Sequence, residues 1–255
     1  MSLPAVLITG GAVRIGAAMA RRFAEAGWHV VIHYRSSSEE ADALATALPS
    51  AETIGCDLND GDAAVAMVET LATKLPNWAA LINSASVFNY DGVTELDPAT
   101  NREAMQVNAV TPARMAQAYL AKASAEKGRR VIHITDQKLE NSNPDFFSYT
   151  MSKHALDATI AMLAFGHSDS SDRIYGLAPG AILASHDQTE DEIELSHKLN
   201  PLKRKTGADE IAEAALFLAT GNLRSGETLY IDSGQHLLNQ KRDVIYLARE
   251  MAGQT

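Results

Sequence analysis

The chain has 255 residues, of which 46% are hydrophobic and 21% are charged, and its formal net charge is −10. This composition predicts a soluble globular protein with a sizeable core and argues against intrinsic disorder. The acidic balance argues against a nucleic-acid-binding protein, which usually presents a basic surface. No apolar run approaches the ~20 residues that a membrane span needs, and the first residues do not resemble a signal peptide.

The single cysteine, Cys56, excludes an intrachain disulfide and fits a reducing, cytoplasmic setting. An acidic loop follows it, with Asp57, Asn59, Asp60 and Asp62, but it lacks the glycine and the distal glutamate of a calcium loop. The histidines show no ligand spacing. We therefore expect no bound metal.

Short apolar runs alternate with longer segments of helical periodicity along the chain. The runs predict strands at 5–9, 30–34, 53–56, 80–83, 130–134, 173–177 and 228–232. The longer segments predict helices at 15–26, 39–47, 63–75, 100–123, 149–165 and 208–218. This alternation is typical of a parallel sheet with helices on both faces. We predict a single α/β domain over residues 1–255, built on one doubly wound, Rossmann-like parallel sheet.

Two segments break this rhythm. Residues 183–201 are polar and acidic, and two hypotheses remain open for them: a lid over the substrate site, or a solvated surface helix. Residues 239–255 place Val244, Leu247 and Met251 at helical spacing, which predicts an amphipathic C-terminal helix. Such a helix would cover either its own subunit or a neighbouring one.

A glycine-containing loop at 9–16 follows the first predicted strand and opens the first helix. Gly10 would permit a tight turn, and Gly16 would permit close contact between helix and strand. The helix N-terminus, at Ile15, would offer N–H groups to a pyrophosphate. Arg14 stands where many such loops carry glycine, and its side chain could reach a phosphate. We predict a dinucleotide-binding loop, with an unliganded turn as the alternative.

The second predicted strand ends in Tyr34, Arg35 and Ser36, and the first acidic residue beyond it is Glu39. Folds that bind NAD place an acid near this position for the ribose 2′-hydroxyl, whereas an arginine accommodates a 2′-phosphate. These residues therefore favour NADP(H) over NAD(H), although Arg35 could also be an ordinary solvated arginine.

Tyr149 and Lys153 are four residues apart at the start of a predicted helix, so they share one face. A free tyrosine has a pKa of about 10, which makes it a poor proton carrier near neutrality. A neighbouring ammonium would favour the phenolate and lower that pKa. We therefore expect Lys153 to adjust Tyr149 for proton transfer.

These features occur together with Asn83-Ser84-Ala85 after the fourth strand, Asn108 in the next helix and Pro179-Gly180 after the sixth. As a set, the motifs resemble the short-chain dehydrogenase/reductase family. The resemblance implies that Tyr149 gives a proton to the substrate, while Lys153 holds the nicotinamide ribose and Asn108 supports a water-linked proton path. It also implies cofactor contacts from residues along the predicted strand ends: Asp57, Leu58, Asn83, Ala85, Pro179, Gly180 and Ile182.

Asp136 stands where most family members carry a serine that binds a substrate carbonyl. An ionised aspartate would repel a ketone oxygen and would suit a substrate that presents N–H donors or needs a proton. Together with Arg14 it resembles the pteridine reductase and dihydromonapterin reductase subgroup. The resemblance implies that Phe88 stacks a flat pterin, although Phe88 could instead be a packed loop residue.

We therefore predict an NADPH-dependent reductase that acts on a small molecule of the pterin class. Two alternatives remain: a general carbonyl or 3-oxoacyl reductase, and a non-catalytic NADP-sensing or scaffold protein. The resemblance also implies a homo-oligomer, either a tetramer or a dimer, formed through the long helices.

Overall fold

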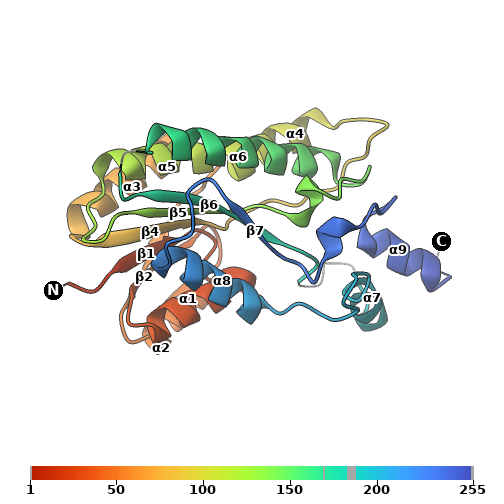
Figure 1. The fold of residues 1–255 in the computed structure, drawn as a ribbon, viewed down its shortest axis with the longest axis horizontal. Helices are drawn as coiled ribbons and strands as arrows, with labels where there is room; N and C mark the ends of the chain where they lie inside the picture. The colour runs from red at the N-terminus through yellow and green to blue at the C-terminus, as the bar shows by residue number, and fades with distance from the viewer. Residues whose placement is uncertain (1, 169, 183–187, 254–255) are drawn as a thin grey trace.

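The computed structural model describes residues 2–168, 170–182 and 188–253. Its centre is a seven-stranded sheet in the order β3-β2-β1-β4-β5-β6-β7 (Figure 1). The strands are β1 (Ala5–Ile8), β2 (His29–Tyr34), β3 (Ala51–Gly55), β4 (Trp78–Asn83), β5 (Arg130–Ile134), β6 (Arg173–Pro179) and β7 (Thr228–Ile231). Every neighbouring pair is parallel. The doubly wound prediction is confirmed.

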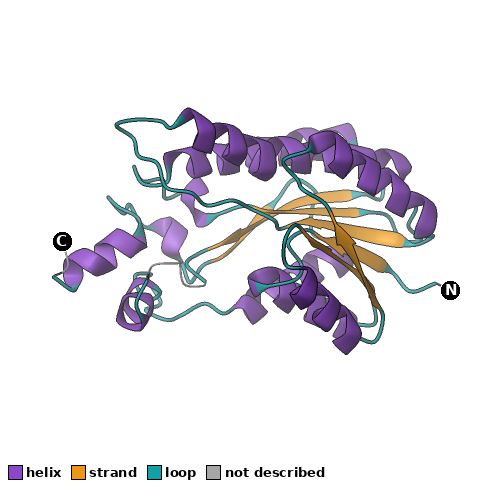
Figure 2. Cartoon of the chain, turned by 180° about the vertical axis from the view of Figure 1, so that it is seen from behind, coloured by secondary structure: helices purple, strands orange, loops and turns teal. Residues whose placement is uncertain are grey.

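Helices cover both faces of this sheet (Figures 1 and 2). One face carries α1 (Arg14–Glu25), α2 (Ser38–Ala47) and α8 (Ala208–Thr220). The other face carries α3 (Gly61–Lys74), α4 (Pro98–Met105), α5 (Thr111–Lys122) and α6 (Phe147–Gly166). Two further helices, α7 (Glu190–Ser196) and α9 (Val244–Met251), lie beyond the carboxyl ends of β6 and β7. Among the described residues, no helix is long and apolar enough to cross a membrane.

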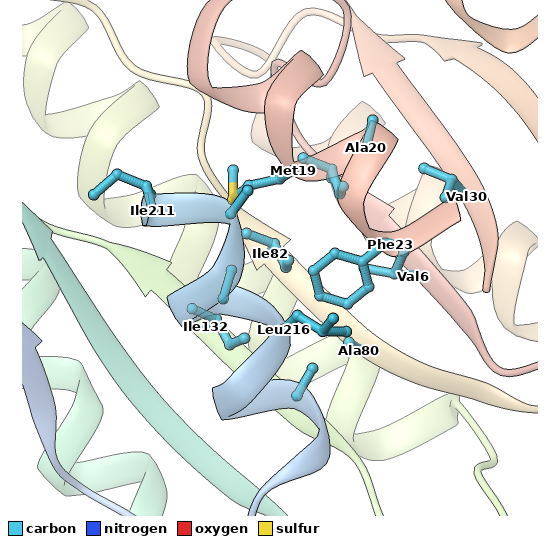
Figure 3. Close-up of a cluster of buried hydrophobic side chains, with 14 of the residues drawn as sticks. Val6, Met19, Ala20, Phe23, Val30, Ala80, Ile82, Ile132, Ile211 and Leu216 are labelled. Carbon is cyan, nitrogen blue, oxygen red and sulfur yellow. The ribbon is translucent and has the colours of Figure 1, made fainter. Parts of the chain in front are cut away.

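A buried hydrophobic cluster fills each space between the sheet and its helices. On the α1–α8 face, Met19 and Phe23 pack against strand residues such as Ile82 (Figure 3). On the opposite face, Trp78 and Tyr119 pack edge to face, with ring centroids 4.8 Å apart. Burial of each large apolar side chain stabilises the fold by about 1.5–3 kcal/mol. These clusters fix the carboxyl ends of the strands, where the candidate site lies.

The long helix predicted at 100–123 is interrupted. A π-helical segment, Gln106–Val110, separates α4 from α5. Pro112 has no N–H, so it cannot donate the ordinary helical hydrogen bond to the carbonyl of Asn108. Short π segments are frequent at functional sites. Periodicity alone did not distinguish this segment from an α-helix.

The described parts of both irregular segments contain helices. Residues 183–187 of the acidic segment lie outside the described residues, and the remainder contains α7, in which Glu192 and Ser196 are buried. The C-terminal helix α9 buries Val244, and it packs against α7. Met251, which we expected on the buried face, is 64% exposed. The described part of 183–201 is therefore not a wholly solvated helix.

Candidate active site

A cavity of about 640 Å³ opens at the carboxyl ends of the strands. The strand order reverses between β1 and β4, and ligands of open α/β sheets bind at such a switch point. The cavity is lined by most of the predicted site residues: Gly10, Arg14, Ile15, Gly16, Tyr34, Arg35, Ser36, Asp57, Leu58, Ala85, Phe88, Asp136, Tyr149, Lys153, Pro179, Gly180 and Ile182. Asn83 and Asn108 are buried behind this lining, at 2% and 1% exposure.

The glycine loop leads from β1 into α1 in the predicted way. Gly10 has φ +63°, in the left-handed region that favours glycine. A Cβ atom on Gly16 would lie 2.1 Å from the carbonyl oxygen of Gly10, so a larger residue cannot replace it without a shift of the loop. Arg14 also has a positive φ of 55°, a conformation that costs a non-glycine residue about 1–2 kcal/mol. The chain thus retains an arginine where the backbone geometry favours glycine.

A hydrogen bond to His33 connects the loop to the second strand, and our sequence interpretation did not identify this histidine as a site residue. The N–H of Gly10 donates to His33 Nδ1 at 3.2 Å, and His33 Nε2 lies 3.0 Å from the carbonyl oxygen of Cys56. Burial lowers the pKa of His33 from 6.5 to about 4. The ring is therefore neutral, with Nδ1 as acceptor and Nε2–H as donor to Cys56. A histidine within an apolar strand was the available signal.

The end of β2 borders the part of the cavity nearest α2. Tyr34, Arg35 and Ser36 all line it, and the Arg35 side chain is 58% exposed, with Nη1 4.0 Å from Glu103 Oε1. A mostly exposed guanidinium remains able to turn towards an anion. The arrangement can hold a phosphate group at the position predicted from the sequence.

Asp57 and Leu58 line the cavity at the end of β3. The carboxylate of Asp57 accepts the N–H of Asn59 at 2.9 Å, so it also fixes its own loop. The carbonyl oxygen of Leu58 accepts a hydrogen bond from Thr111 Oγ1 at 2.8 Å. This pair therefore combines a place in the cavity wall with a structural role. Among the described residues, no cluster of His, Cys, Asp and Glu could hold a metal ion.

Asp136 and Tyr149 are in direct contact. The Tyr149 hydroxyl donates to Asp136 Oδ2 at 2.6 Å. Lys153 Nζ donates to the carbonyl oxygen of Ile134 at 2.8 Å and lies 5.6 Å from the centre of the Tyr149 ring. The three side chains come from the end of β5 and from two successive turns of α6, as the spacing predicted. The hydrogen-bond partner of the tyrosine is the aspartate.

Burial changes the acidity of all three groups. It raises the pKa of Tyr149 well above 10, and the Asp136 carboxylate raises it further. It also raises the pKa of Asp136, and it lowers the pKa of Lys153 from 10.5 to about 8. Burial and the nearby carboxylate therefore shift the pKa of Tyr149 in the direction opposite to the lowering that we expected from Lys153.

Asn108 uses its side chain to position neighbouring elements. Its Oδ1 accepts the N–H of Val87 at 2.8 Å, and its Nδ2 donates to the carbonyl oxygen of Val87 and to Ser152 Oγ. These bonds join the π-helical segment, the loop after β4 and α6. The proton path through Asn108 stays a prediction.

Asn83 is likewise a buried link between elements. Its Nδ2 lies 3.2 Å from His133 Nδ1 and 3.4 Å from the carbonyl oxygen of Pro112. Burial lowers the pKa of His133 from 6.5 to about 3, and the Lys153 ammonium lowers it too. Asn83 therefore supports the cavity from behind, whereas Ala85, two residues on, lines it.

Phe88 belongs to an aromatic cluster beside Tyr149. Its ring stacks on Phe146, with centroids 4.0 Å apart, and meets Tyr149 edge to face at 4.6 Å. One face of Phe88 is therefore already covered by Phe146. Ile245 and Tyr246 of α9 pack against this cluster. The contribution of Phe146 and of the C-terminal helix was not visible in the sequence, because the partners are distant along the chain.

With this geometry described, the chain can be compared with known proteins. The family described as enoyl-(acyl carrier protein) reductase matches residues 11–236. FolM alternative dihydrofolate reductase 1 from Brucella canis, solved in complex with NADP, is 30% identical with a TM-score of 0.87, covering 94% of this chain and 96% of that one. Dihydromonapterin reductase from Citrobacter koseri is 26% identical over 234 residues, 91% of this chain and 96% of the relative. The 7alpha-hydroxysteroid dehydrogenase of Escherichia coli is 28% identical over 240 residues, covering 89% and 92%.

These similarities extend over nearly the whole sheet and its helices. The chain also has the glycine loop after β1, the contact between Asp136 and Tyr149, and Lys153 one helical turn further on. The resemblance inferred from the sequence motifs is confirmed. This chain belongs to the short-chain dehydrogenase/reductase family of oxidoreductases.

Proposed function

We propose that this oxidoreductase uses NADPH to reduce a nitrogen-rich ring of the pterin class. The observation that carries the proposal is the partly buried hydrogen bond of 2.6 Å between Tyr149 and Asp136. A serine at position 136 would donate to a substrate carbonyl, whereas a carboxyl group can accept N–H donors or deliver a proton to a ring nitrogen. The names of the relatives from Brucella canis and Citrobacter koseri support the same substrate class.

The residues around the glycine loop fit NADP(H). The close approach of Gly16 to Gly10 leaves the backbone open to a pyrophosphate, and the N-terminus of α1 points its N–H groups there. Arg35 and Ser36 would hold a 2′-phosphate, and Lys153 would hold the nicotinamide ribose. When bound, the reduced nicotinamide supplies a hydride to a carbon of the substrate double bond.

The chain itself supplies the proton that accompanies the hydride. Tyr149 and Asp136 share one hydrogen bond. The pKa of Tyr149, raised well above 10, keeps its hydroxyl protonated, and burial raises the pKa of Asp136 from its ordinary value towards neutrality. Proton loss from Tyr149 would leave a phenolate, which Lys153 stabilises from the same helix face. The pair therefore acts as the proton donor, with Lys153 as its electrostatic support.

The cavity wall also offers polar atoms suited to a heterocycle. Thr135 Oγ1, Gln137 Oε1 and His197 Nδ1 are buried and have no hydrogen-bond partner within the described residues. All three residues line the cavity. A buried polar atom without a partner costs about 1–3 kcal/mol, so a substrate gains affinity when these side chains turn their polar atoms towards it. A pterin ring carries several donors and acceptors at its edge.

The test is NADPH oxidation with dihydropterins, compared with ketones and 3-oxoacyl thioesters. We expect turnover of the dihydropterin, and we expect Asp136→Ser to lower it by about 10²-fold or more, because proton transfer by a positioned group contributes ~10²–10⁴-fold. A carbonyl reductase, which the steroid dehydrogenase relative makes a specific alternative, would instead keep or gain activity with Asp136→Ser. NADPH binding without turnover of either class would support the non-catalytic alternative.

A further inference from the structure

A buried ion pair outside the predicted site lies next to Asp136. Lys138 Nζ is 2.8 Å from Asp243 Oδ2, and the two side chains are only 3% and 9% exposed. The Lys138 ammonium also donates to Asn143 Oδ1 at 2.9 Å and to the carbonyl oxygen of Asp145 at 3.5 Å. Its three N–H bonds therefore have three partners. Lys138 and Asp243 both line the cavity.

Lys138 is connected to the proton donor through its own backbone. Its N–H donates to Asp136 Oδ1 at 2.8 Å, and the Tyr149 hydroxyl donates to the other oxygen, Oδ2. The carboxyl group of Asp136 thus lies between the tyrosine and the backbone of the lysine. Asp243 in turn bonds to the lysine side chain. These contacts run without a break from Tyr149 to Asp243.

Asp243 is held firmly at the start of α9. It is the N-cap of that helix, accepting the N–H of Ile245 at 3.1 Å. Its own N–H donates to Asp145 Oδ2 at 2.8 Å, and Asp145 also pairs with Arg242 at 2.8 Å. The position of α9 therefore decides where the Asp243 carboxylate lies.

We propose that the Lys138–Asp243 ion pair is a positioning pair, through which the C-terminal helix α9 sets the charge of Asp136 and so the proton available to Tyr149. The part of this inference that concerns proton donation rests on the proposed function. Lys138 acts through Asp136, to which its N–H donates. Asp243 acts through the side chain of Lys138 and, by its charge, on Tyr149 directly.

Among the residues that the structure describes, few charged groups act on Asp136. From α6 come the Tyr149 hydroxyl and the Lys153 ammonium, and from the turn at Gln137–Leu139 comes the Lys138 ammonium. The lysines lower the pKa of Asp136 against the larger effect of burial, which raises it. From the C-terminal segment, the Asp243 carboxylate raises the pKa of Tyr149. In a site of low dielectric constant, such charges interact strongly.

The experiment follows the protonation of Asp136 directly in the whole chain without substrate. Infrared spectra recorded across a pH series show the protonated carboxyl band, which is assigned to Asp136 by its loss in Asp136→Asn. We expect Lys138→Met to move the midpoint of this band to higher pH, because a positive charge is lost. We expect Asp243→Asn to move it to lower pH, because the lysine charge is no longer balanced. Each shift should be about one pH unit.

Matched variants separate charge from packing. Lys138→Arg keeps the charge, so its midpoint should lie close to that of the unmodified chain. Lys198 follows α7 and forms an exposed ion pair with Glu194 of that helix. Lys198→Met removes this charge and should leave the midpoint unchanged. If Lys138→Met does not fold, Asp243→Asn still decides the question, since asparagine keeps an oxygen that can cap α9.

Unchanged midpoints in Lys138→Met and Asp243→Asn, or shifts in the same direction, would overturn the proposal and leave the pair with a structural role only. The test does not depend on turnover. If the chain does not reduce dihydropterins, the proposed function fails while the midpoints are still measured. If it does reduce them, the pH dependence of kcat/KM should shift to higher pH in Lys138→Met and to lower pH in Asp243→Asn.

Discussion

At the scale of single residues, burial controls the chemistry more strongly than neighbouring charges do. Lys153 lies one helical turn from Tyr149, yet the pKa of the tyrosine is raised because burial and Asp136 dominate. His33 follows the same logic, since the cost of burying an imidazolium keeps its ring neutral. Its neutral form is what allows Nδ1 to accept the Gly10 N–H.

This neutral histidine predicts a pH-dependent stability. Below pH 6.5 the unfolded chain takes up a proton at His33, whereas the folded chain does not until about pH 4. The free energy of unfolding should therefore fall as pH falls through this window, with a slope of about 1.4 kcal/mol per pH unit and a total near 3 kcal/mol from this residue. Denaturant unfolding of His33→Asn between pH 7 and pH 4 should lack this contribution.

The matched control is His29→Asn, on the same strand but with a side chain 25% exposed. The acid dependence of His29→Asn should keep the contribution of His33. If the free energy of unfolding has the same pH slope in His33→Asn and in the unmodified chain, His33 takes up its proton in the folded state over the same pH range as in the unfolded chain.

At the scale of elements, the start of α6 is the key feature. Phe146, the residue before the helix, has φ 56° and is buried, which is a strained conformation for a large side chain. The first turn is capped from a distant loop, since the N–H of Ser148 donates to Asp91 Oδ1 at 2.8 Å and its hydroxyl donates to Oδ2. Asp91 is 4% exposed. This contact fixes the helix that carries Tyr149 and Lys153.

Replacement of this cap should lower both stability and activity. We expect Asp91→Ala to reduce the free energy of unfolding by about 1–3 kcal/mol, because it leaves buried donors without a partner. We also expect a lower kcat, because Tyr149 moves with the first turn of α6. Chemical denaturation and steady-state kinetics measure the two effects.

Asp97→Ala provides a control, because Asp97 caps α4 at the surface by accepting the N–H of Thr100. It should cost less stability and leave kcat unchanged. A kcat for Asp91→Ala equal to that of the unmodified chain would mean that the cap does not position Tyr149.

At the scale of the whole molecule, the exposed apolar residues of α6 bear on assembly. Met162 is 64% exposed and Phe165 is 84% exposed, three residues apart on the same helix. We predict that this pair belongs to an interaction surface, because large contiguous apolar patches are rare on the surface of monomers. This fits the homo-oligomer that we predicted through the long helices.

We expect the chain to sediment as a dimer or tetramer, and we expect the double variant Met162→Ser and Phe165→Ser to shift it towards smaller species. Sedimentation velocity over a concentration series measures this. Leu3 lies near the N-terminus and is 52% exposed. Leu3→Ser should not change the sedimentation profile. A monomer at every concentration for the unmodified chain would contradict the prediction.

The sequence was enough to predict the succession of strands and helices along the chain. It also predicted the loop at Gly10 and the shared helix face of Tyr149 and Lys153. These features depend on local periodicity and on residues close together along the chain. Element ends also agreed closely, except around Asn108, where the effect of Pro112 on the helix was not anticipated.

The environment of each residue of the candidate site was decided only by the tertiary structure. The links from Gly10 to His33, from Ser148 to Asp91 and from Lys138 to Asp243 join residues far apart in sequence, and no local pattern reports them. The pKa values depend on how much water the surrounding elements exclude, which is a property of the packed molecule. The sequence by itself therefore determined the kind of fold and the placing of Tyr149 and Lys153 on one helix face, and the packing determined how acidic those two groups are.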